Sequence, residues 1–269
     1  MSPIISINLS RSFFLILLRI FSIAHDKNLF HQKFYREWRR ARIKKLLKIY
    51  NVKHKKILEL GAGIGVIGKF LSKAGANVTT SDARVFNLKK IKSKKIIKIP
   101  INNDEDNWSQ VFINKKERFN LIIHWGLLYH LYNWKADLKE CLKIADYICL
   151  ETIILKKEGD SDDIIFEFGQ DQSANFFAKI PSQDSIEKYL KKLRCTFKRY
   201  DHKNLDVYLC PRYSYVNKFI LKILSFFLKN YFLFKNGKVC SHNYSWNSNP
   251  PFFARRFWFI KNNNLYNKF

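Results

Sequence analysis

Between Lys55 and about Thr152, short apolar runs alternate with longer stretches of helical periodicity. This alternation is typical of a parallel sheet whose strands are joined by crossover helices. The predicted strands are Ile57–Leu60, Asn77–Ser81, Ile96–Ile99, Phe119–His124, Tyr147–Glu151, Thr196–Tyr200 and Arg256–Ile260. The predicted helices begin near Gly65, Ala83, Asp104 and Trp134, and one more covers Ser185–Arg194. The pattern therefore predicts an α/β fold, a Rossmann-like sheet of seven mostly parallel strands with helices on both faces.

The two remaining parts of the chain have helical patterns of their own. Residues 1–50 are predicted to form an N-terminal helical extension, and residues 51–269 one domain with an insertion at about 201–250. Within that insertion, the polar positions of Tyr215–Phe234 fall on one face of a helix. A core helix with one solvent-exposed polar face and a basic helix lying on a membrane both fit this pattern. The apolar run at Phe13–Ala24 is too short and interrupted to cross a bilayer.

The charge and the cysteine content indicate which binding partners and which cellular compartment suit the protein. The chain has 269 residues, with 49 Lys and Arg against 22 Asp and Glu, a net charge of +27. Such a field attracts nucleic acid, anionic lipid or acidic substrates, but compositional bias toward Lys, Asn and Ile explains it equally well. The five cysteines form no CxxC pair, which favours reduced thiols and a cytoplasmic protein, peripheral to a membrane if the apolar segments bind one. We expect no metal site.

The strongest chemical signal is a glycine-rich turn that follows the first predicted strand and opens a helix. Glycine permits the tight turn and lets a ligand press against bare backbone, while amide groups at the helix start face an anionic group. The turn residues that we expect to bind a cofactor are Gly61, Ala62, Gly63 and Gly65.

Two cofactors compete for this turn. Gly63-x-Gly65-x-x-Gly68 matches the dinucleotide fingerprint, and Asp82 lies 19 residues after Gly63, near the spacing of a ribose-binding acid. Glu59, at the end of the strand, decides between them. Its carboxylate would repel the pyrophosphate of NAD but attract the ammonium and sulfonium charges of S-adenosylmethionine. At about 4 Å such a charge interaction is worth roughly 4 kcal/mol.

Polar residues after the next two strands would complete the cofactor site. Asp82 ends the second strand, where its carboxylate can accept the ribose hydroxyls or cap the following helix. Asn102 and Asp104 follow the third strand, and either side chain could bind the adenine amine.

The motif that runs from Glu59 to Gly65 resembles motif I of class I methyltransferases, and Phe119–Leu131 resembles their fourth strand and the segment after it. The run GLLYHL at 126–131 is similar to bacterial small-molecule and surface-glycan-associated methyltransferases, and more distantly to tRNA wobble-uridine carboxymethyl transferases. The resemblance implies that Glu59, Gly61, Gly63 and Asp82 contact S-adenosylmethionine, with His124 beside the transferring methyl. Relatives often carry an acid in place of Asn102.

Candidates for catalysis and acceptor binding lie further along the chain. The segment after the fourth strand passes the open edge of the sheet, so His124, Tyr129 and His130 are candidates for a general base. Glu151 ends the fifth strand and could hold an acceptor amine or hydroxyl. Tyr244 and Trp246 lie in an aromatic loop that could close over a sugar or ring.

Three functions remain open from the sequence. The first is methyl transfer to a small molecule or glycan, which the resemblance implies. The second is an RNA (tRNA) methyltransferase that uses the basic surface, although no RNA-binding module is recognisable. The third is an NAD(P)-dependent oxidoreductase built on the same glycine turn.

Overall fold

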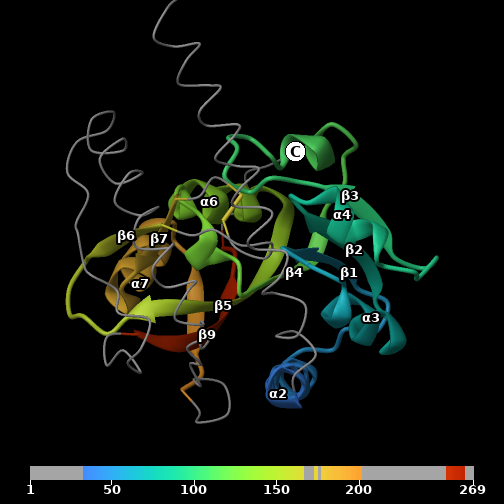
Figure 1. Ribbon diagram of the computed structural model, residues 1–269, viewed down its shortest axis with the longest axis horizontal. Coiled ribbons are helices and arrows are strands. Elements are labelled where there is room, and N and C mark those ends of the chain that lie inside the picture. The colour runs from blue at the N-terminus through green and yellow to red at the C-terminus, as the bar shows by residue number, and fades with distance from the viewer. Residues whose placement is uncertain (1–32, 167–172, 175–176, 202–252, 264–269) are drawn as a thin grey trace, which may run out of the picture.

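The computed structural model describes residues 33–166, 173–174, 177–201 and 253–263. Its main sheet has seven strands in the order β3-β2-β1-β4-β5-β9-β8 (Figure 1). These strands are β1 (Lys56–Leu60), β2 (Asn77–Asp82), β3 (Ile97–Pro100), β4 (Phe119–Trp125), β5 (Ala145–Leu155), β8 (Thr196–Arg199) and β9 (Phe253–Lys261). A separate hairpin pairs β6 (Asp162–Phe166) with β7 (Phe177–Pro181).

Most strand pairs are parallel, which confirms the predicted fold. β1 pairs in parallel with β2 and β4, β2 with β3, and β4 with β5, whereas β9 runs antiparallel to both β5 and β8. The chain winds outward from β1 in one direction through β2 and β3, and in the other through β4 and β5. Ligands of open α/β sheets bind beyond the carboxyl ends of the strands at such a reversal point.

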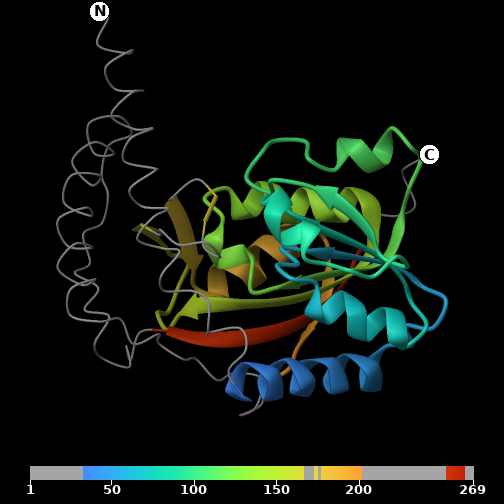
Figure 2. The same ribbon diagram turned by 45° about the vertical axis from the view of Figure 1, so that its right-hand side comes forward.

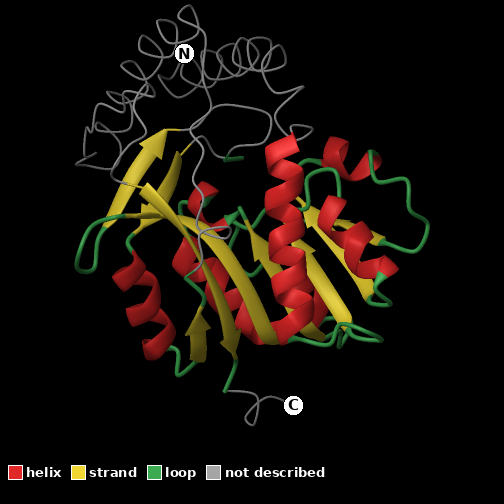
Figure 3. Ribbon diagram, turned by 90° about the horizontal axis from the view of Figure 1, so that it is seen from below, coloured by secondary structure: helices red, strands yellow, loops and turns green. Residues whose placement is uncertain are grey.

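Helices cover both faces of this sheet. They are α2 (Lys33–Ile49), α3 (Val66–Lys73), α4 (Val85–Lys89), α5 (Gln110–Ile113), the 3-10 turn η1 (Leu128–His130), α6 (Trp134–Ile144) and α7 (Gln183–Lys192). Buried side chains of α2, α3 and α4 form one core with Ile57, Leu121 and Phe257. Side chains of α5, α6 and α7 form the other core. Figures 2 and 3 show α2 lying along the sheet beside α3.

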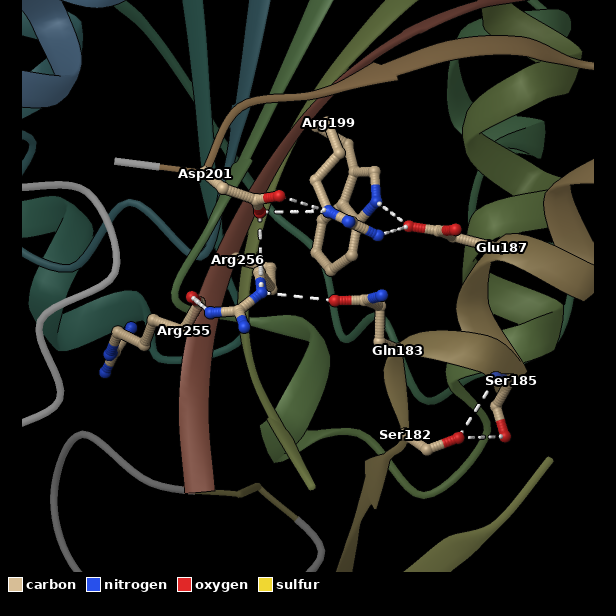
Figure 4. A network of polar contacts seen from close by, with 9 residues as sticks. Ser182, Gln183, Ser185, Glu187, Arg199, Asp201, Arg255 and Arg256 are labelled. Carbon is tan, nitrogen blue, oxygen red and sulfur yellow. Dashed lines mark hydrogen bonds and ion pairs between the residues drawn. The ribbon is translucent and has the colours of Figure 1, made fainter. Parts of the chain in front are cut away.

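The outer strands are fixed by a polar network on the side of α7 (Figure 4). Glu187 accepts hydrogen bonds from Arg199 Nη1 at 2.6 Å and from Trp258 Nε1 at 3.1 Å. Arg256 Nε donates to Gln183 Oε1 at 3.1 Å. Arg255 projects away from this network, as side chains do at adjacent positions of a strand.

Three local features differ from the sequence prediction. Helix α5 begins at Gln110, not near Asp104, because Asn102 and Asp104 bond to loop backbone: Asn102 Oδ1 accepts from Asp104 N, and Asp104 Oδ1 from Asn133 N. The fifth strand extends to Leu155. The β6–β7 hairpin was not predicted. Among the described residues, no helix is both long and apolar enough to span a membrane.

Candidate functional site

The glycine turn after β1 adopts a backbone that only glycine accepts without strain. Gly61, Gly63 and Gly65 have φ values of 59°, 53° and 69°, in the left-handed region. A Cβ at Gly65 would lie 2.6 Å from Ile91 Cδ1, so this glycine is needed for packing. A Cβ at Gly63 would meet nothing within 4 Å. Gly63 therefore leaves open space over the turn, where a ligand can approach bare backbone.

Asp82 ties the end of β2 to this turn. Its Oδ2 accepts a hydrogen bond from Gly63 N at 2.8 Å, and its Oδ1 accepts from Arg84 N at 2.8 Å and Asn87 Nδ2 at 3.3 Å. The N-cap position of α4 is Arg84, with no side-chain capping bond, so Asp82 holds the residue before the helix and is not itself the cap. A carboxylate has about four acceptor positions, so the Asp82 carboxylate retains capacity for one more donor.

Glu59 lies beneath the start of α3 and is buried. Its Oε2 accepts from Gly68 N at 3.0 Å, and a Cβ at Gly68 would lie 2.5 Å from that oxygen. Gly68 is thus the residue that lets the helix approach the strands closely. Its other oxygen, Oε1, finds no hydrogen-bond partner among the described residues.

Burial changes the charge state that the sequence argument assumed for Glu59. The pKa of the Glu59 carboxyl is raised to about 8, mainly by desolvation and to a smaller extent by the nearby charge of Asp82. The hydrogen bond from Gly68 and the charge of Arg39 lower the pKa only in part. A cationic ligand close to this carboxyl would favour its ionised form.

The loop after β3 is bound to the start of α6. Asn102 is partly exposed and its Nδ2 donates to Glu105 Oε1 at 3.1 Å. The neighbouring Asn103 and Asp104 are buried. Asn103 Nδ2 donates to Asp137 Oδ1 at 2.8 Å. Of the two candidates for the adenine amine, Asn102 is therefore the more accessible.

His124 is fully buried at the end of β4, on the face covered by α6. Its Nε2 lies 2.6 Å from Asp137 Oδ2, and within the part of the chain that the structure describes its Nδ1 has no hydrogen-bond partner. Ligand atoms of His124, Asp137 and Cys141 lie within 4.8 Å of one another. Two ligands of a tetrahedral zinc ion stand about 3.4 Å apart, so the His124–Asp137 contact is a hydrogen bond as it stands.

Tyr129 and His130 lie together in η1, just beyond the end of β4. Their ring centroids are 3.9 Å apart. Arg255 Nη2 donates to Tyr129 Oη at 3.3 Å, and its guanidinium lies over the Tyr129 ring. A Cβ at Gly61 would lie 3.1 Å from Leu127 Cδ1, so the segment after β4 also contacts the glycine turn.

Glu151, predicted to hold an acceptor, is fully buried between two guanidinium groups. Its Oε1 accepts from Arg42 Nη2 at 2.6 Å and from Arg255 Nη1 at 2.9 Å. Its Oε2 lies 4.0 Å from a Cβ placed at Gly126, and no described residue forms a hydrogen bond with it. The pKa of Arg42 is lowered to about 9, mainly by burial. The charge of Glu151 opposes this shift, and the charge of Arg255 adds to it.

Several residues around this site were not singled out from the sequence. Three of them are buried charged side chains that each pair with a residue of another helix or strand: Arg42, Asp137 and Arg255. A lone Arg or Asp inside a helix or strand pattern carries no signal of burial, so only the fold could reveal them. The predicted acceptor residues Tyr244 and Trp246, and the helix Tyr215–Phe234, lie outside the described residues.

Comparison with known proteins decides the family. Residues 30–201 match the family described as "Methyltransferase domain", which is more than half of the chain. The chain belongs to this family. The methyltransferase uses S-adenosylmethionine as its cofactor, and the open backbone at Gly63 beside the Asp82 carboxylate fits that group. This result does not favour the nicotinamide-dependent alternative.

Solved structures show the same fold at low sequence identity. The N-terminal domain of EvdMO1, crystallised with S-adenosylhomocysteine, is 14% identical, with a TM-score of 0.55 over 82% of this chain and 81% of that one. The same domain crystallised with S-adenosylhomocysteine and D-fucose gives a TM-score of 0.54 at 14% identity over 82% of both chains. Magnesium protoporphyrin IX methyltransferase from Synechocystis PCC 6803 gives 0.49 at 12% identity over 87% and 84%. A search of curated proteins finds no match.

Proposed function

We propose that this methyltransferase transfers a methyl group to a small-molecule or glycan acceptor bound beside η1. One observation carries the proposal: the segment after β4 packs against the glycine turn through Leu127, and the adjoining rings of Tyr129 and His130 follow two and three residues later. A cofactor held by the turn would then have its methyl group close to these two side chains. The EvdMO1 domain crystallised with D-fucose has the same fold, which supports a sugar as one class of acceptor.

The cofactor assignments follow from the same geometry. Backbone at Gly61, Ala62, Gly63 and Gly65 would face the amino-acid part of the cofactor. Asp82 would accept a ribose hydroxyl, and Asn102 would bind the adenine amine. Glu59 would act from beneath α3, where its carboxyl is buried and accepts a hydrogen bond from Gly68 N. The sulfonium of the bound cofactor would favour the ionised form of this carboxyl.

When bound, the cofactor supplies a sulfonium-activated methyl group, and its sulfur retains the electron pair of the broken carbon–sulfur bond. The protein has to orient the acceptor atom and exclude water, which can contribute several kcal/mol, up to about 7–11. His130 would take the proton of a hydroxyl acceptor and Tyr129 would line the pocket. His124 is buried against Asp137, so it would shape the end of β4 from inside the core.

Strand β7 of the β6–β7 hairpin packs against η1. Lys179 N donates to Leu131 O at 3.0 Å, and Lys179 Nζ lies over the Tyr132 ring. If the acceptor binds beside η1, the hairpin bounds that site on one side, which suits a small acceptor better than a long duplex RNA. Glu151, held by two arginines and buried, would fix Arg255 beside Tyr129 and so act on the acceptor pocket through Arg255.

The test uses methyl-labelled S-adenosylmethionine with separate pools of nucleotide sugars, extracted glycans and total tRNA. We expect label in a sugar or glycan fraction, and we expect His130→Gln to lower kcat. Loss of a general base costs about 10²–10⁴-fold in rate. Label found only in tRNA would contradict the proposal and favour the RNA alternative.

A further inference from the structure

Two buried hydrogen bonds converge on Asp137, in the first turn of α6. Its Oδ2 lies 2.6 Å from His124 Nε2 at the end of β4, and its Oδ1 accepts from Asn103 Nδ2 at 2.8 Å in the loop after β3. Asp137 and His124 are 0% exposed and Asn103 is 5% exposed. The Asp137 carboxylate thus joins the loop after β3 to the end of β4, through two residues that are 21 positions apart in the chain. Strands β3 and β4 lie on opposite sides of β1 in the sheet.

We propose that Asp137 is a positioning residue for the cofactor's adenosine part, because it holds the loop after β3 against the end of β4. The inference rests on the proposed assignment of that loop to the adenine ring. Asn103 is the direct tie, and its neighbour Asn102 is the residue assigned to the adenine amine. A shift of Asn103 would therefore move Asn102 with it.

A second bond shows that the loop is fastened to α6 at more than one point. Asp104 Oδ1 accepts from Asn133 N at 3.0 Å, the residue just before α6. Asn102 Oδ1 in turn accepts from Asp104 N at 3.2 Å. Loss of Asp137 would remove the buried tie, whereas the bond at the helix start would remain. The loop would remain attached but would no longer be held at one position.

The chemistry of the cluster favours a hydrogen-bonded tie. Because an ionised carboxylate only accepts, His124 Nε2 carries the hydrogen in its bond to Asp137. The nearby Cys141 stays a thiol, since burial raises its pKa well above the usual value. Removing Asp137 would leave the Asn103 amide and the His124 imidazole buried without an acceptor, and such groups move to find one.

The experiment measures the affinity of S-adenosylhomocysteine and of 5′-methylthioadenosine, which lacks the amino-acid part, by calorimetry. Asp137→Ala should weaken both ligands by about tenfold, since the loss concerns the shared adenosine. Asp137→Asn should stay within about threefold of the unaltered enzyme. Its amide oxygen still accepts from Asn103, and its amide nitrogen can donate to Nε2 after the imidazole moves its hydrogen to Nδ1.

Glu140→Ala is the matched control. Glu140 lies three residues along α6 and is 6% exposed, and its Oε2 accepts from Ser109 Oγ at 2.6 Å. Ser109 ends the same connection just before α5, six residues after Asn103, so this buried bond lies at the other end of the segment from the adenine assignment. We expect it to lower thermal stability and to leave both affinities unchanged. Asn103→Ala, a change in the loop itself, replaces Asp137→Ala if that variant does not fold.

The outcomes separate the inference from the function on which it rests. Wild-type affinity in Asp137→Ala or Asn103→Ala, or an equal loss in Glu140→Ala, overturns the positioning role. Loss of S-adenosylhomocysteine affinity with unchanged 5′-methylthioadenosine affinity also overturns it, because the adenosine would not be involved. If the unaltered enzyme bound neither ligand, the cofactor-site assignment would fail first, and the inference with it.

Discussion

The main-chain amide of Gly63 donates a 2.8 Å hydrogen bond to Oδ2 of Asp82, 19 residues further along the chain. This bond fixes the left-handed turn after β1 against the end of β2, at the point where the strand order reverses. The turn and the carboxylate are therefore positioned together before any ligand arrives. The cofactor site depends on this preorganisation, and its consequences can be tested one residue at a time.

Gly63→Ala should separate cofactor binding from folding. A Cβ there meets no protein atom within 4 Å, so the cost in stability is the left-handed strain of about 1–2 kcal/mol. The same Cβ would occupy the space left for the ligand, so affinity for S-adenosylmethionine should fall at least about tenfold. Thermal unfolding and calorimetry measure the two effects.

Gly159→Ala is the control for that change. Gly159 also has a positive φ, of 79°, and open space at the Cβ position, but it lies before β6. It should show the same strain and unchanged cofactor affinity. Equal affinities for the two variants would mean that the ligand does not press against Gly63.

Glu59 should make stability fall as the pH rises. Its pKa is about 8 in the folded protein against 4.5 in an exposed carboxyl, so the folded state keeps a proton that the unfolded state has lost. The contribution of Glu59 to the free energy of unfolding is therefore fully present below about pH 4.5. It decreases as the pH rises from there to about 8, by at most roughly 1.4 kcal/mol per pH unit. Denaturant unfolding between these pH values should give a steeper decline for the unaltered protein than for Glu59→Gln. Equal slopes would show that Glu59 is not protonated in the fold.

Glu151→Gln should be strongly destabilising. It removes the carboxylate that lies between the buried guanidinium groups of Arg42 and Arg255, and breaking a buried ion pair costs about 3–5 kcal/mol. Asp146→Asn removes the exposed partner of Arg118, at 3.4 Å, and should cost no more than about 1 kcal/mol. Urea unfolding compares the two. A Glu151→Gln variant as stable as Asp146→Asn would contradict the structural role of the ion cluster.

The parallel sheet and the glycine turn were predictable because their signals are local. An apolar run that ends in Gly61, Gly63 and Gly65 specifies a strand, a left-handed turn and a helix start within ten residues. The loop after β3 was mispredicted as a helix because Asn102 and Asp104 bond to distant or neighbouring backbone, a competition that periodicity does not record.

The buried charges around the site could not be predicted in the same way. Arg42 meets Glu151 across 109 positions, and Arg255 meets it across 104. Glu151 at the end of an apolar strand predicted an open carboxylate, but two distant arginines enclose it. His124 was expected beside the methyl group, and its strand position was right, yet the alternation of β4 directs its side chain into the core toward Asp137.

The most direct test of the central claim compares S-adenosylhomocysteine with NADH by calorimetry, for the unaltered chain and for Asp82→Ala. We expect micromolar-range binding of S-adenosylhomocysteine to the unaltered chain, a loss of that binding in Asp82→Ala, and no binding of NADH. Binding of NADH without S-adenosylhomocysteine, or full S-adenosylhomocysteine affinity in Asp82→Ala, would contradict the assignment of the glycine turn and the β2 carboxylate as the cofactor site.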